Sequence, residues 1–94
     1  MQEARVSPFV LRIVEVFSLA GGVTVLVGNL ESGSPLVLAP CNVELVIGGK
    51  SYGEIGLDSE RMPGPGSMGR RAVETRAEIG TEELRNQSGL LIHR

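Results

Sequence analysis

Two pairs of adjacent glycines constrain the fold of this chain more than any other feature. Gly21-Gly22 and Gly48-Gly49 each separate two runs of residues that are rich in Val, Leu and Ile. Glycine pairs between such runs are typical of tight turns that join antiparallel strands. The chain is therefore expected to fold through hairpins of neighbouring strands.

Alternating apolar residues and turn signals predict seven strands along the chain. They span residues 9–18, 23–31, 36–39, 43–47, 52–57, 71–79 and 89–93. Residues 58–69, which contain Met62-Pro63-Gly64-Pro65-Gly66-Ser67, are expected to form a loop. One short helical turn is expected at residues 80–84, with Thr81 as its cap.

The first strand is apolar on both of its faces, which predicts burial on both sides. Simple alternation places Phe9, Leu11, Ile13 and Phe17 on one face and Val10, Arg12, Val14 and Val16 on the other. The three aromatic residues of the chain, Phe9, Phe17 and Tyr52, are assigned to the core. Gly28, inside the second strand, predicts a bulge or a close approach by another backbone.

Length and composition place these strands in one small all-β domain. The 94 residues suffice for a single domain, residues 1–94, and 13 glycines and 5 prolines supply many turns. A sheet with no long helix to cover it must hide its edges, and closure achieves this. We therefore expect a small closed antiparallel β-barrel of six or seven strands with one short helical turn.

Charge and cysteine content set limits on partners and location. The formal net charge is −2, so there is no overall basic field for nucleic acid. The single cysteine, Cys41, excludes an internal disulfide bond. Arg12 and Glu15 interrupt the apolar stretch 10–28, which argues against a membrane span, and residues 1–8 show no signal pattern. A cytoplasmic location is expected.

The order of these residues resembles the second domain of elongation factor Tu and related translational GTPases. The family has an "I-x-x-V-F" strand, a glycine turn, and a "G-T-V-x-x-G-x-v-x-x-G" strand and turn. The matching residues are Ile13, Val16, Phe17, Gly21, Thr24, Val25, Gly28, Glu31 and Gly33. Residues 79–84 and 89–92 are similar to the family's final turn and strand.

The resemblance implies a translation-factor-like binding barrel without catalytic activity. In elongation factor Tu this domain helps to hold the aminoacylated end of transfer RNA, and in related factors it contacts the ribosome or partner proteins. Gly28 and Glu31 fall on the region that lines the pocket for the tRNA end, and Asn29 stands where the family has arginine. The GTPase domain of the family is missing from this sequence.

The best candidate for anion binding in the sequence is an arginine cluster. Arg70, Arg71 and Arg76 lie close together, and the planar donor fork of arginine suits phosphate. Glu74 and Glu78 stand among them, so ion pairing at a solvated surface is the competing interpretation.

No other group of residues predicts catalysis, a metal or a cofactor. Cys41 and His93 are the only conceivable nucleophile and base, but no third residue would orient them. Gly49-Lys50-Ser51 lacks the first glycine of a phosphate-binding loop and is interpreted as a hairpin turn. One His and one Cys cannot complete a zinc site. The carboxylates Glu54, Asp58 and Glu60 lack a calcium-loop pattern and are expected to be solvated.

Two functions remain after these exclusions. The first is a module that binds a protein partner as an adaptor, an inhibitor or an immunity-type protein, and Met62 and Met68 suit either such contacts or core packing. The second is an RNA- or ribonucleoprotein-binding module that contacts tRNA or the ribosome through the arginine cluster. An uncovered barrel edge would also allow two copies to pair by strand addition.

Overall fold

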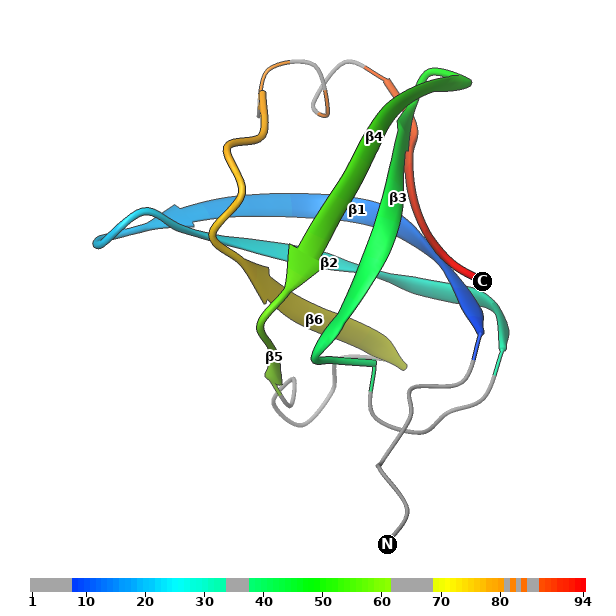
Figure 1. Ribbon diagram of the computed structural model, residues 1–94, viewed down its shortest axis with the longest axis horizontal. Coiled ribbons are helices and arrows are strands. Elements are labelled where there is room, and N and C mark those ends of the chain that lie inside the picture. The colour runs from blue at the N-terminus through cyan, green and yellow to red at the C-terminus, as the bar shows by residue number, and fades with distance from the viewer. Residues whose placement is uncertain (1–7, 34–37, 62–68, 81, 83, 85–86) are drawn as a thin grey trace, which may run out of the picture.

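The computed structural model describes residues 8–33, 38–61, 69–80, 82, 84 and 87–94. They form an all-β structure with one seven-stranded antiparallel sheet, in the order β4-β3-β7-β1-β2-β6-β5 (Figure 1). The strands are β1 Phe9–Leu19, β2 Val23–Gly33, β3 Cys41–Ile47, β4 Lys50–Leu57, β5 Ser59–Arg61, β6 Arg70–Thr75 and β7 Gly89–His93. The all-β, antiparallel part of the prediction is confirmed.

Both glycine pairs lie at hairpin turns, as the sequence predicts. Ile47 and Lys50 are paired across the β3–β4 turn, and Gly48 and Gly49 between them have φ values of 59° and 82°. Such positive φ values at both central residues define a turn whose twist matches that of the strands it joins. Gly49-Lys50-Ser51 is therefore part of a β-hairpin, and no helix follows it.

The core lies on the concave face of the sheet, and residues paired across neighbouring strands point their side chains to this same face. Leu11, Leu91 and Leu45 are directly opposite one another on β1, β7 and β3, and all three are buried. Leu26 and Val73 form the equivalent pair on β2 and β6. Burial of these branched side chains on one face contributes about 1.5–3 kcal/mol each to the free energy of folding.

A bulge at Val14 overturns the prediction that β1 alternates without interruption. Ile13 is opposite Gly28 but Glu15 is opposite Val27, so Val14 is an extra residue in β1. An extra residue reverses which side chains face the core in the rest of the strand. Val16 therefore packs against the core, and Phe17 faces outward. The predicted burial of both faces and the core assignment of Phe17 are wrong for this half of β1. The core assignment of Tyr52 is wrong as well, because this side chain is exposed on β4, whereas that of Phe9 is confirmed.

The close approach predicted at Gly28 is confirmed. A Cβ atom at this position would overlap the backbone of Arg12 and Ile13 on β1. Only a residue without a side chain lets β2 pass this close to the bulged strand.

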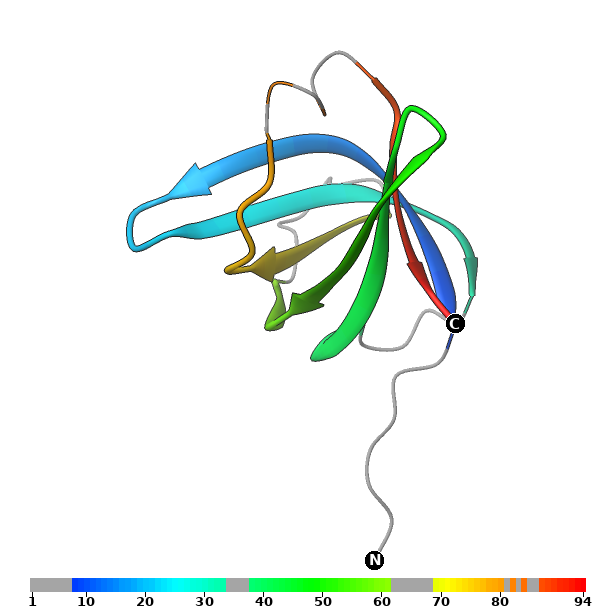
Figure 2. The same cartoon turned by 45° about the horizontal axis from the view of Figure 1, so that its top comes forward.

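The sheet curls strongly but does not close into the predicted barrel. β1 and β2 extend beyond the other strands as a two-stranded ribbon, in blue and cyan in Figures 1 and 2. At the other side, Thr75 Oγ1 donates to the Gly56 carbonyl over 2.6 Å, and the Asp58 amide donates to the Glu74 carbonyl over 2.8 Å. These single bonds replace a strand ladder, because β5 has only three residues and β4 turns into it at Asp58.

Smaller differences concern the connections. Ser59–Arg61 forms strand β5, although the sequence predicts a loop at 58–69, because these residues pair with β6. β6 ends at Thr75, whereas the sequence predicts a strand to residue 79. Leu38 and Ala39 are not in a strand, and residues 36–37 lie outside the described residues. At the predicted helical turn, the Leu84 amide donates to the Gly80 carbonyl over 3.4 Å, while Thr81 lies outside the described residues.

Candidate protein-interaction surface

The outer half of β1 has a strand on only one of its two sides among the described residues. β7 pairs with β1 from Phe9 to Ile13 and goes no further, whereas β2 follows β1 as far as Leu19. The segment Glu15–Leu19, which we call the free edge of β1, therefore has no strand partner on this side within the described part of the chain. An unpaired strand edge is a template for the addition of another strand.

Apolar side chains surround this free edge. Four large hydrophobic residues are exposed among the described residues, and three of them are on this part of β1: Val14 (40% exposed), Phe17 (49%) and Leu19 (40%). The exposure of Phe17 follows directly from the bulge at Val14. Clustered exposed apolar side chains in a soluble domain mark contact surfaces more often than isolated ones do.

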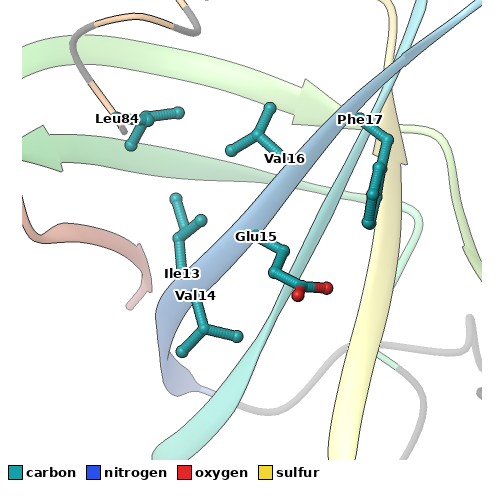
Figure 3. Close-up of a pocket in the computed structure, with 6 residues that line it drawn as sticks. All are labelled: Ile13, Val14, Glu15, Val16, Phe17 and Leu84. Carbon is teal, nitrogen blue, oxygen red and sulfur yellow. The ribbon is translucent and has the colours of Figure 1, made fainter. Parts of the chain in front are cut away.

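A pocket of about 280 Å³ lies beside the free edge. Figure 3 shows Ile13, Val16 and Leu84 grouped on one side of the β1 ribbon, while Glu15 and Phe17 point to the other side. Leu84 comes from the segment that follows β6, so the pocket joins two parts of the chain that are distant in sequence. Its apolar side chains would accept the side chains of an added strand.

The outer edge of β4 differs from the free edge of β1 in its chemistry. It carries the charged residues Lys50 and Glu54, and the Lys50 ammonium lies 5.7 Å from the centre of the Tyr52 ring. Charged side chains on an edge strand discourage pairing with other chains. By contrast, Glu15 is the only charged residue of the free edge of β1.

The structure separates the three arginines of the predicted anion site. Arg71 faces inward, and its Nε lies 2.5 Å from Oε2 of Glu60, with side-chain exposures of 18% and 5%. Arg76 lies 4.0 Å from the Asp58 carboxylate in solvent. Arg70 is exposed and has no ion-pair partner among the described residues. Glu60, expected to be solvated, is instead buried and also accepts a hydrogen bond from the Leu38 amide over 2.9 Å.

The three residues that the family resemblance assigns to the pocket for the tRNA end, Gly28, Asn29 and Glu31, all lie on β2. Asn29 is exposed between Arg12 on β1 and Arg70 on β6, in one row across three strands. Glu31 pairs with Arg12, and both line an open pocket of about 400 Å³ on the outer face of the sheet. Gly28 serves the close approach of β1 and β2 described above.

Cys41 and His93 have separate surroundings. The Cys41 thiol donates to the Leu38 carbonyl over 3.0 Å, and burial raises the pKa of this thiol to about 11. The His93 ring stacks against Phe9 with 5.4 Å between the ring centres. A thiol with a raised pKa is a weak nucleophile at neutral pH because little thiolate is present.

Within the described ranges, no group of three or more His, Cys, Asp or Glu side chains is arranged to hold a metal ion. The same part of the chain contains no helix that is long and apolar enough to cross a membrane.

The comparisons with known proteins found no match: no family model, no curated protein and no solved structure is similar to this chain. The resemblance to translational GTPases therefore stays a prediction from the sequence.

Sequence patterns alone place Phe17 in the core, so they miss the free edge. The signal that would have revealed it is the combination of Gly28 with a first strand that is apolar on both faces. A glycine inside a strand often marks a bulge or a place where another backbone approaches closely.

Proposed function

We propose that this chain is a non-catalytic protein-binding domain that contacts its partner through the free edge of β1. One observation carries the proposal: an unpaired strand segment with exposed apolar side chains, of which Phe17 at 49% exposure is the largest. Strand addition to such an edge supplies backbone hydrogen bonds, and alternate side chains supply specificity. The raised pKa of Cys41 supports a role without nucleophilic catalysis.

The test compares two aromatic residues that are exposed to a similar extent, 49% and 45%, on different strands. The tagged domain is used to capture partners from an extract of its host, with RNase present, and bound proteins are identified by mass spectrometry. Phe17→Lys should abolish capture of a specific protein, whereas Tyr52→Lys, on the edge of β4, should leave it intact. Equal capture by all three proteins would refute the proposed site.

RNA binding is a second candidate, and the row of Arg12, Asn29 and Arg70 favours it. These residues put two guanidinium groups on one exposed face, although Glu31 neutralises Arg12. RNA affinity that falls steeply with salt and is weakened by Arg70→Ala would support this function. An RNA affinity that changes neither with salt nor on replacement of Arg70 would rule out this second function.

A further inference from the structure

We propose that the free edge of β1 pairs with the free edge of a second copy of this chain, forming a symmetric antiparallel dimer. This inference rests on the proposed function, since it names the partner of the same surface. Three observations support a second copy: the limits of the free edge, the placement of its only charge, and the side chains that would meet across a two-fold axis.

The limits of the free edge determine the register of such a pair. At the N-terminal end of the free edge, pairing of β1 with β7 stops at Ile13 and the bulge occupies Val14. At its C-terminal end, β1 itself ends at Leu19. The five residues Glu15–Leu19 remain, and Phe17 is the middle one. A two-fold axis perpendicular to the sheet through Phe17 uses the whole edge, and each hairpin turn stops beside the bulge of the other copy. A shift toward Val16 would push the turn of one copy into β7 of the other.

This register brings complementary side chains together. Phe17 faces its own symmetry mate, Glu15 faces Leu19, and Val16 faces Ser18. Aromatic side chains directly opposite each other in antiparallel strands stabilise the pair. Phe17 is also directly opposite Val25 of its own β2, and Val25 is buried.

The charge pattern of the edge is compatible with self-pairing. Glu15 is the only charged residue between Val14 and Leu19. In this register the two copies of Glu15 are four residues apart along the strands, about 14 Å at 3.4 Å per residue. That separation exceeds the screening length of about 8–10 Å at physiological salt, so the two carboxylates repel each other weakly. Like charges meet only if the axis passes through Glu15, which disfavours that register.

The contact is small, so the dimer is expected to be weak and dependent on concentration. Five strand residues and two phenylalanines bury less than the roughly 1,200 Å² that stable protein interfaces require. The pocket beside the edge, whose lining includes Ile13, Val16 and Leu84 as well as residues of the edge itself, adds apolar surface that the second strand would cover.

Sedimentation equilibrium of the full chain over a concentration series is the first test. The wild type and Tyr52→Lys should show the same monomer–dimer equilibrium, and Phe17→Lys should weaken it at least about tenfold, equivalent to ~1.4 kcal/mol. A wild type that stays monomeric throughout, or equal weakening by both lysine variants, would overturn the proposal.

Disulfide cross-linking tests the register independently of the lysine variants. In a Cys41→Ser background, Phe17→Cys should form a covalent dimer under mild oxidation, because directly paired strand residues have Cα atoms about 4.5–5.5 Å apart. Leu19→Cys is the matched control, since its symmetry mate would be about 14 Å away. Cross-linking through Leu19→Cys but not Phe17→Cys contradicts this pairing. A monomer that nevertheless loses partner capture on Phe17→Lys would refute self-pairing alone and leave the proposed function standing.

Discussion

At the scale of single residues, burial decides the chemistry of Cys41. The thiol is half-buried at the start of β3 and donates its hydrogen to the Leu38 carbonyl. Loss of hydration disfavours the thiolate, so the pKa is raised from an ordinary 9.0 to about 11. At neutral pH this cysteine is therefore a small apolar residue with one hydrogen bond, and a nucleophilic role would need a base that lowers the pKa.

We predict that Cys41 reacts slowly with a thiolate-specific reagent in the folded protein. Because the pKa rises by about two units, the thiolate fraction at pH 8 should be ~100-fold lower than in the unfolded chain. Alkylation rates measured from pH 7 to pH 11, with and without urea, check this. The folded-state rate should keep rising toward pH 11, while the unfolded rate levels off near pH 9. A folded-state rate that levels off near pH 9 would mean that only access limits the reaction.

At the scale of elements, the bulge in β1 is the feature that creates the candidate surface. It turns Val16 toward the core and Phe17 toward solvent, the reverse of simple alternation from Ile13 onward. The bulge at Val14 directly follows Ile13, the last residue of β1 that pairs with β7. At this one point β1 therefore loses its partner on one side, and the direction of its side chains is reversed. The exposed apolar edge is thus the result of one extra residue.

The bulge predicts opposite sensitivities for two neighbouring residues. Val16→Asp should destabilise the fold by about 2–4 kcal/mol, because it puts an unpaired charge against the core. Phe17→Asp should cost about 1 kcal/mol or less, because it changes a side chain that is half exposed. Urea unfolding of both variants measures the difference. The reverse order would mean that β1 alternates without the bulge.

At the scale of the whole molecule, the part-buried carboxylate of Glu60 links the β5–β6 edge of the sheet to the segment that precedes β3. Glu60 on β5 binds Arg71 on β6 and also accepts the amide of Leu38, which precedes β3. This contact lies near the place where the two ends of the curled sheet approach each other without a strand ladder. Arg71 therefore holds the fold together, which limits its use as a contact for an external phosphate.

Arginine replacements should accordingly separate stability from binding. Arg71→Ala leaves the Glu60 carboxylate buried without its partner and should destabilise the protein by about 3–5 kcal/mol. Arg70→Ala removes an exposed side chain and should change the free energy of unfolding by no more than about 0.5 kcal/mol. Thermal and urea unfolding check both values. If the two variants are equally stable, the Arg71–Glu60 pair does not support the fold.

The sequence by itself determined most of the strands and both glycine turns, since these depend on local properties. The Gly48-Gly49 turn follows from backbone freedom, and Gly89–His93 has the limits that its apolar pattern predicts. Closure and side-chain direction depend on contacts between distant residues. Only the tertiary structure decided that β5 pairs with β6, that the sheet stays open, and that Phe17 faces outward. The physical reason is that one extra residue in β1 is invisible until its pairing with β2 is known, yet it reverses every side chain beyond it.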